Sequence, residues 1–150
     1  FGIEWALPVE YSNLRFYGVG PEETYADRKH AKLGVWSTDA YRDRAPYLLP
    51  QETGNHEDVR WAEITDDSGH GLRVEHTVKP FAMSLLPYSS AMLEEALHQD
   101  ELPKPRHMFL RLLAAQMGVG GDDSWMSPVH AQYQLPADQP LSLNVRLKLF

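Results

Sequence analysis

Residues 59–78, VRWAEITDDSGHGLRVEHTV, carry the clearest information about the fold. Residues 59–65 and 72–78 each alternate between apolar and polar side chains, which is the period of a strand with one face on a core. The link between them, residues 66–71, is rich in aspartate and glycine, as is typical of a turn. The stretch therefore predicts a β-hairpin whose two strands share one buried face.

Further strands are predicted on both sides of this hairpin. Residues 14–19 predict one, and the first residues of the chain are strand-like. Residues 141–149 also alternate, and their apolar face consists of Leu141, Leu143, Val145, Leu147 and Leu149. The 11 prolines and 10 glycines are spread along the whole chain, as turns between many short strands require. We therefore expect a β-sandwich that forms a single domain over residues 1–150.

Helical signals are few. Residues 90–98, SAMLEEALH, combine a serine cap and early glutamates with apolar residues at helical spacing. They predict a short helix of two to three turns. Residues 107–117, HMFLRLLAAQM, fit a helix by propensity and a buried strand equally well by pattern. The expected fold class is mainly β with one short helix.

The composition argues against several kinds of partner. The 150 residues contain 14 lysines and arginines against 21 aspartates and glutamates, a net charge of −7. This balance disfavours nucleic acid and anionic membranes, because neutralising phosphates requires a basic surface. The absence of cysteine excludes disulfides and favours the cytoplasm. No apolar run approaches the roughly 18 residues of a membrane span. The chain starts on a strand-like segment without an initiator methionine, so we expect a fragment.

Spacing alone predicts no metal site. The seven histidines include no pair at i,i+2 or i,i+4, the spacings that present two imidazoles on one face of a strand or helix. The adjacent acids Glu22-Glu23 and Asp122-Asp123 would point to opposite faces of a strand. The two carboxylates of a retaining glycosidase lie roughly 5–5.5 Å apart across a sugar, so neither acidic pair is expected to be a catalytic pair by itself.

A glycine-rich segment carries the most unusual feature. Residues 118–121, GVGG, lack the lysine and hydroxyl residue of a phosphate-binding loop, so we interpret them as backbone that needs positive φ. They lead into Asp122, Asp123, Ser124 and Trp125. An indole on such a loop is either packed in the core or displayed for a ligand such as the C–H face of a hexose. The pattern alone leaves both alternatives open.

Three motifs occur together in this chain. They are FYGVGPEETYADR at 16–28, YLLPQETGN at 47–55 followed by DVRW at 58–61, and MGVGGDDSW at 117–125. In order and spacing they resemble the GxGPxExYxDR, PYxxPQENGN..DVRW and MGxGGDxSW motifs of one family. That family is the C-terminal small-chain domain of the large bacterial β-galactosidases, in glycoside hydrolase family two. The likeness extends from about Leu14 to the end of the chain.

The sequence departs from the family pattern at three positions. Thr53 stands where asparagine is usual, and His56 and Glu57 stand where a basic residue and threonine are common. These departures concern local turn contacts. The family's domain is nearly twice this length, so the resemblance implies that residues 1–150 are its C-terminal part. It also implies a large antiparallel β-sandwich of the supersandwich type, similar to galactose mutarotase.

The resemblance implies a role in hydrolysing terminal β-D-galactosyl bonds, as in lactose, with retention. The two catalytic glutamates of such enzymes lie in a separate barrel domain, so no catalytic residue is expected here and the isolated chain should be inactive. The third motif reaches over the barrel mouth, and its tryptophan, here Trp125, forms part of the sugar-binding wall. Expected partners are the barrel-containing remainder, a galactoside, and further subunits in a homo-oligomer or a hetero-oligomer of large and small subunits. The family often binds magnesium and sodium in other domains, and no cofactor is expected in this chain.

The resemblance also implies supporting roles. The expected loop supports are Gly118, Gly120 and Gly121, which let the chain turn, and Asp122, Asp123 and Ser124, which bond its backbone. The expected structural residues of the other motifs are Gly20, Pro21, Glu23, Tyr25, Asp27, Arg28, Glu52 and Arg60. We expect Arg28 to pair with Glu22, Glu23 or Asp27, and Glu52 to pair with Arg60.

Two other functions are alternatives at this point. The first is an independent carbohydrate-binding sandwich that uses the same indole, although such modules usually present two or three aromatic residues on one face. The second is a scaffold domain without sugar contact, in which Trp125 is buried.

Overall fold

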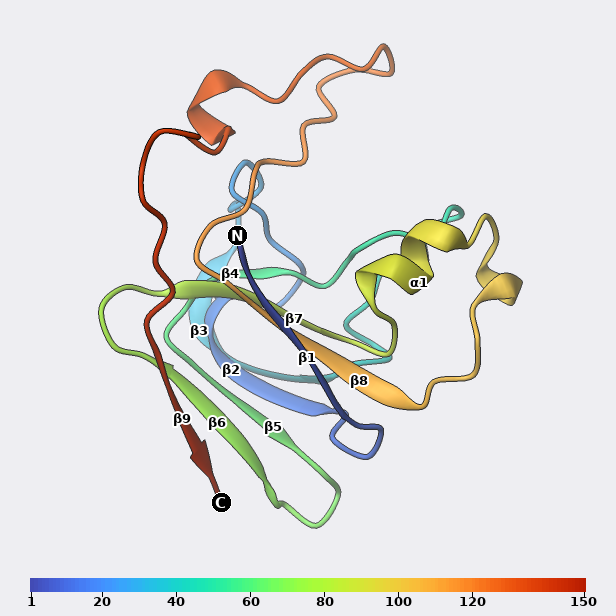
Figure 1. The fold of residues 1–150 in the computed structure, drawn as a ribbon, viewed down its shortest axis with the longest axis vertical. Helices are drawn as coiled ribbons and strands as arrows, with labels where there is room; N and C mark the ends of the chain where they lie inside the picture. Colours follow the sequence, from blue (N-terminus) through green and yellow to red (C-terminus); the bar gives the residue numbers. More distant parts are fainter.

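The computed structural model describes all residues from 1 to 150 and shows two antiparallel β-sheets packed against each other (Figure 1). The first sheet has the order β1 (Gly2–Pro8), β8 (His107–Leu113), β7 (Phe81–Leu86), β4 (His56–Val59). The second has the order β3 (Lys32–Asp39), β2 (Asn13–Gly20), β5 (Trp61–Thr65), β6 (Gly71–His76), β9 (Val145–Leu149). One α-helix, α1 (Ser90–Glu95), and two 3₁₀ turns, Gln99–Glu101 and Ala131–Tyr133, complete the elements. The predicted mainly β sandwich with one short helix is confirmed.

The hydrophobic core fills the space between the sheets. Phe16 and Ile64 from the second sheet are fully buried and belong to one cluster with Met83 and Leu110 from the first. Alternate residues of the strands supply this cluster, as the period of a half-buried strand requires. Burying each side chain of this size contributes about 1.5–3 kcal/mol. The core therefore holds the two sheets in a fixed relation and supports the loops that leave them.

The predicted hairpin is confirmed as β5 and β6. Ala62 lies opposite Val74, and Ile64 lies opposite Leu72. In the turn, the Asp66 carboxylate accepts the N–H groups of Ser68 and His70 at 2.8 and 3.0 Å. An aspartate that bonds its own backbone two residues on stabilises a turn without help from the rest of the protein.

The first predicted strand of the hairpin is divided between the two sheets. Val59 ends β4, which pairs with β7, whereas Trp61 begins β5, which pairs with β2. Asp58 has a φ of 55°, and the β4–β7 ladder changes register between His56 and Val59. The chain therefore crosses from one sheet to the other at Arg60.

The predicted helix of residues 90–98 is shorter than expected. The structure has α1 only over Ser90–Glu95, and Ser89 provides the cap by accepting the Met92 N–H at 3.2 Å. Leu93 is the one buried residue of α1, so packing supports little more than a single turn. The ambiguous residues 107–117 form the strand β8 as far as Leu113, paired on both sides with β1 and β7.

The predicted C-terminal strand is also shorter, because only Val145–Leu149 pairs with β6. β9 is an edge strand, so Leu149 remains largely exposed although it faces the same way as the core residue Val74. Two strands, β3 and β7, were not predicted. All six residues of β7 are buried, which removes the alternation that marks a half-exposed strand. No helix is long and apolar enough to cross a membrane.

Candidate functional site

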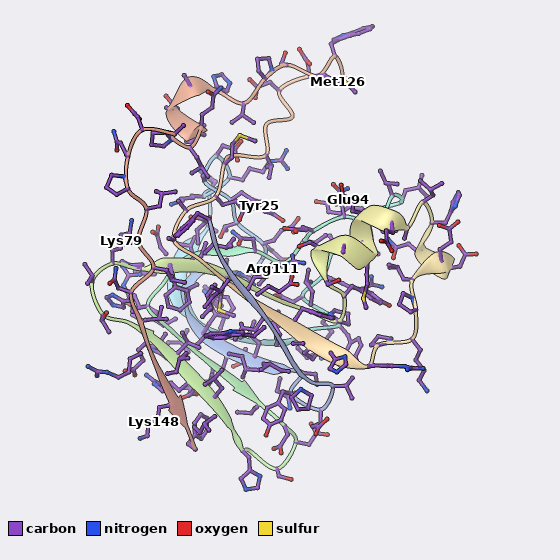
Figure 2. The ribbon with its side chains drawn as sticks, viewed as in Figure 1. Tyr25, Lys79, Glu94, Arg111, Met126 and Lys148 are labelled. Atoms are coloured by element: carbon purple, nitrogen blue, oxygen red, sulfur yellow. The ribbon has the colours of Figure 1, made fainter.

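A long loop between β8 and β9 rises away from the sandwich (Figure 1). Trp125 and Met126 lie at its tip, 85% and 96% exposed, and Figure 2 shows Met126 far from both sheets. Trp125 is therefore not packed in the core of residues 1–150, contrary to the core-packing alternative. An indole in water has a higher free energy than a buried one. The loop that carries this indole is held in position by hydrogen bonds.

The Asp27 carboxylate anchors the base of the loop. It accepts the Val119 N–H at 3.0 Å and the Gly120 N–H at 2.7 Å. Asp27 belongs to the first sequence motif and the two N–H groups to the third, 92 and 93 positions away. Charge-assisted hydrogen bonds of this kind are about twice as strong as neutral ones. The first motif therefore holds the third.

Arg28 reaches the same turn. Its guanidinium donates to the Gly120 carbonyl at 3.1 Å, so neighbouring residues 27 and 28 bind the N–H and the C=O of one peptide segment. The expected ion pair of Arg28 with Glu22, Glu23 or Asp27 is wrong, since no such pair lies within 4 Å. The acids that were expected to attract it are engaged elsewhere: Asp27 binds the loop backbone and Glu23 binds two tyrosines.

The three loop glycines are required for two different reasons. Gly120 and Gly121 have φ values of 67° and 88°, in the left-handed region that favours glycine. Gly118 is needed because a Cβ there would lie 2.6 Å from the Asp27 carboxylate and 2.9 Å from Tyr133 Cβ. The Gly118 N–H also donates to the Tyr133 carbonyl at 2.9 Å, which ties the two stems of the loop together.

Asp123 fixes the tip. Its carboxylate accepts the Trp125 N–H at 2.8 Å, the Ser127 N–H at 3.3 Å and the Ser127 hydroxyl at 2.6 Å. The expected role of Asp123 in bonding the loop backbone thus agrees with the geometry. Asp122 bonds the His130 side chain instead of the backbone, and Ser124 supplies none of these bonds. The expected backbone hydrogen bonds of Asp122 and Ser124 are therefore wrong. In this tight turn the Asp123 carboxylate already accepts the nearby N–H groups.

The supports of the loop predict a pH dependence. Burial raises the pKa of Asp27, but the hydrogen bonds from Gly120 and Val119 outweigh it and lower that pKa below 3.8. The Ser127 hydroxyl and the N–H groups of Trp125 and Ser127 lower the pKa of Asp123 in the same direction. A lowered folded-state pKa means that these bonds stabilise the loop fully above pH 3.8 and are lost as the pH falls through the lowered pKa values.

Carboxyl chemical shifts measured by NMR against pH check this prediction. Both aspartates are expected to titrate with midpoints below 3.8. Ser127→Ala should raise the midpoint of Asp123 and leave that of Asp27 in place, because the hydroxyl bonds only Asp123. Midpoints in the usual range of an aspartate carboxyl in the parent protein would contradict this prediction.

Glu23 joins the first motif to the second. Its carboxylate accepts the Tyr25 hydroxyl at 3.0 Å, the Tyr47 hydroxyl at 2.8 Å and the Gly54 N–H at 2.8 Å. Burial and the Glu23 charge raise the pKa of Tyr25, and the hydrogen bond to Glu23 raises that of Tyr47. Figure 2 shows Tyr25 near the base of the projecting loop. The first motif thus connects the other two.

Gly20 and Pro21 begin this connecting segment, and the peptide bond between them is cis. A Cβ at Gly20 would lie 2.9 Å from the Trp36 ring, so close packing explains the glycine. The Trp36 indole N–H donates to the Gly18 carbonyl at 3.2 Å and keeps the ring in that position.

The expected pair between Glu52 and Arg60 is wrong. Glu52 lies 3.2 Å from the buried Arg111 of β8 and accepts a 2.5 Å hydrogen bond from Ser90. Arg60 instead donates to the Asp58 carbonyl at 3.0 Å and lies over the Tyr17 ring at 5.2 Å. The crossing between sheets at Arg60 places its side chain beside β2, whereas Glu52 packs on β8 of the other sheet.

The loop combines an exposed indole with carboxylates that are mostly engaged in holding its own backbone. No three histidine, aspartate or glutamate side chains are grouped so as to hold a metal ion. The carboxylates of Asp27 and Asp123 already accept hydrogen bonds from backbone N–H groups. What the loop offers is an exposed indole in a fixed position, which suits binding and orientation of a partner molecule.

Comparison with known proteins assigns the family. A family model described as β-galactosidase small chain matches residues 1–147. The chain belongs to the β-galactosidase small-chain family. The match begins well before Leu14, so the first strand β1 is part of the family's pattern as well. The resemblance of the three motifs to the β-galactosidase small-chain domain is thereby confirmed.

Several curated members of the family are similar over most of this chain. β-Galactosidase BgaC of Bifidobacterium adolescentis is 89% identical over 152 aligned residues that cover 100% of this chain. A β-galactosidase of Streptococcus thermophilus is 40% identical over 99% of it. The chain spans 14% of the length of each of these two relatives. A β-galactosidase small subunit of Latilactobacillus sakei is 36% identical over 93% of this chain, which covers 46% of that subunit.

Three residues of the small-chain motifs and their loop were not among the predicted site residues. Tyr47 binds Glu23, Ser127 binds Asp123, and Met126 shares the exposed tip with Trp125. The spacing of Asp123 and Trp125 is a signal for a turn in which an aspartate accepts the N–H two residues on. Tyr47 begins the second motif, but its partner Glu23 could not be predicted from the local pattern because it lies 24 positions away.

Proposed function

We propose that this chain is the part of a β-galactosidase that supplies one aromatic wall of the active site. The whole enzyme hydrolyses terminal, non-reducing β-D-galactose residues with retention, with lactose-type substrates, and its catalytic glutamates lie outside this chain. The observation that carries the proposal is the exposed Trp125 on a loop held at its base by Asp27 and at its tip by Asp123.

The chemistry of galactose favours such a wall. One face of the hexose carries C–H groups that stack on an indole while the hydroxyls remain free to bond elsewhere. Removing roughly 50–80 Å² of apolar surface from water contributes about 1–2 kcal/mol. A preformed loop adds no ordering cost at the moment of binding, which is the benefit of fixing its backbone beforehand.

The partner of this surface is the barrel-containing remainder of the enzyme. The chain covers 14% of two β-galactosidases and 46% of a protein named as a small subunit, so relatives carry this region in chains of very different length. The proposal accommodates a single polypeptide or separate large and small subunits, and a homo- or hetero-oligomer. In each arrangement the isolated chain is inactive.

A reconstitution assay tests the proposal. The barrel-containing remainder is assayed for hydrolysis of a chromogenic β-galactoside, alone and with the complete small-chain domain added. Activity that appears only when the domain is present supports a part that completes the enzyme. Full activity of the remainder alone contradicts it. Galactoside binding by the small-chain domain alone, with no effect on hydrolysis, favours an independent carbohydrate-binding module.

A further inference from the structure

The strand β3 forms one edge of the second sheet, and one side of it has no strand partner within this chain (Figure 1). It pairs only with β2, in an unbroken register over all of its eight residues. The N–H and C=O groups on its other side are therefore open to pairing with a further strand. β3 is also the longest of the four edge strands of the sandwich.

Each of the other three edges carries a feature that discourages pairing with another chain. β1 contains Glu4 and Pro8, and β4 has only four residues and a shift in its register. β9 presents Arg146 and Lys148 between its apolar residues. In β3, by contrast, residues 33–38, LGVWST, contain neither a charge nor a proline. Such an unprotected edge is a site where another strand can add to the sheet.

Exposed side chains that face the core indicate where further strands of the same sandwich belong. Ile3 of β1 and Leu147 and Leu149 of β9 point toward the space between the sheets but are exposed. β1 and β9 lie toward one end of the sandwich, because β4, the opposite edge of the first sheet, packs beside β2 and hence near β3. At the β3 end, the partly buried Trp36 packs against the core and closes it. Further strands of the sandwich are therefore expected at the β1–β9 end, which leaves the β3 edge for a separate partner.

A second copy of this chain is complementary to the β3 edge. Antiparallel pairing about a two-fold axis brings the start of each strand beside the end of the other. Lys32 begins β3 and Asp39 ends it, so the adjoining ends of the two strands carry opposite charges. Because both copies use the same edge, no other surface has to be supplied.

Side-chain packing selects one register for this pairing. Opposed residues must lie on the same face of the joined sheet. A register centred on Val35 places Val35 opposite the same residue of the second copy and Leu33 opposite Ser37 on the outer face. On the inner face it places Gly34 opposite Trp36, which keeps the two indoles apart. Other registers pair fewer residues or place the two indoles directly opposite each other.

We propose that β3 pairs antiparallel with β3 of a second copy, in the register centred on Val35, and joins two small-chain sandwiches through one continuous sheet. Val35 and Leu33, which are 50% and 46% exposed, then lose part of their contact with water. The inference is independent of the role of Trp125. It concerns the assembly of the complete protein and assigns no residue to the reaction.

Disulfide cross-linking in the complete protein tests this register. Residues directly opposite each other in antiparallel strands have Cα atoms about 4.5–5.5 Å apart, a distance that a disulfide spans. Residues 1–150 contain no cysteine of their own. On oxidation, Val35→Cys is expected to give a link between residue 35 of two copies, identified by mass spectrometry of the linked peptides.

Leu33→Cys is the matched control, because Leu33 has a similar exposure on the same face of β3. In the proposed register its counterpart in the second copy lies roughly 13 Å away along the strand, so it should not link to itself. A link at residue 33 as efficient as that at residue 35, or no link at residue 35, overturns the inference. A cysteine at residue 35 that links to another segment of the complete protein also overturns it, because that segment then covers the edge.

Charge substitution at the same position gives a second test, read by sedimentation of the complete protein at several concentrations. Val35→Lys and Val35→Asp each place like charges directly opposite each other, so each variant alone is expected to associate about fivefold more weakly than the parent. A mixture of the two variants should recover the association, because lysine then faces aspartate. Val78→Lys alters an exposed valine on the link between β6 and β7 and should have no effect. Equal association of the parent, the two single variants and their mixture overturns the inference.

Discussion

Under the proposed function, replacing Trp125 by alanine in the complete protein is expected to raise KM for lactose about tenfold to thirtyfold. The factor follows from roughly 50–80 Å² of apolar surface that the indole and the galactosyl ring would no longer bury against each other. Thermal unfolding should change little, since the indole is 85% exposed and contributes almost nothing to the core. Steady-state kinetics with lactose and with a chromogenic galactoside measure the effect.

Two further variants sharpen this result. Trp125→Phe keeps an aromatic face and should recover most of the affinity, whereas Trp125→Leu keeps apolar area without a flat ring and should recover less. Trp61→Phe alters a tryptophan on β5 that packs against the Arg15 and Arg73 guanidiniums, and it should leave KM unchanged. Equal KM values for the parent and Trp125→Ala would show that the indole does not touch the substrate.

Replacing Asp27 by alanine is expected to reproduce most of the Trp125→Ala defect without touching the indole. The Val119 and Gly120 N–H groups lose their acceptor, so the base of the loop is released and the indole samples many positions. KM should rise by up to about tenfold, because the loop must then be ordered on binding. Asp27→Asn retains one carbonyl acceptor and should fall between the parent and the alanine variant.

The matched control for this variant is Asp67→Ala. Asp67 is also an aspartate that accepts one long-range hydrogen bond, from Asn13 at 3.0 Å, but it lies in the β5–β6 turn. Its removal should leave KM unchanged. Because Asp27 acts through Trp125, the double variant Asp27→Ala/Trp125→Ala should be no worse than Trp125→Ala alone. Additive losses would mean that Asp27 contributes to the enzyme by another route.

Local chemistry explains which parts of the fold could be predicted from sequence. The β5–β6 hairpin has both alternation and an aspartate turn within about twenty residues, and both signals act over short range. β7 was missed because burial on both faces erases alternation, and β8 stayed ambiguous because an apolar segment fits a helix or a strand until its neighbours are known. The crossing at Arg60 depends on pairing with β7 and β2, which no local pattern contains.

The same difference between short-range and long-range contacts decides which site residues could be predicted. Gly120, Gly121 and Asp123 could be assigned to the turn from sequence because each acts within a few residues of its own position. The hydrogen bonds from Asp27 and Arg28 to this turn span more than ninety positions and replace the ion pairs that proximity in sequence suggested. The family resemblance identified the three motifs but did not predict the hydrogen bonds between them. Those bonds show why the first motif, which lies far from the tip, accompanies the third.

The most direct test of a sugar-binding role for Trp125 places a fluorine label on the indole of residue 125 in the complete enzyme. The resonance of fluorotryptophan at this position is identified by its disappearance in Trp125→Phe, and a non-hydrolysed thiogalactoside is then titrated. We expect this resonance to shift and saturate at the concentration that inhibits hydrolysis, and the response to be broadened or absent in Asp27→Ala. A resonance that stays in place while the inhibitor fully occupies the enzyme would contradict a role for Trp125 in the sugar-binding wall.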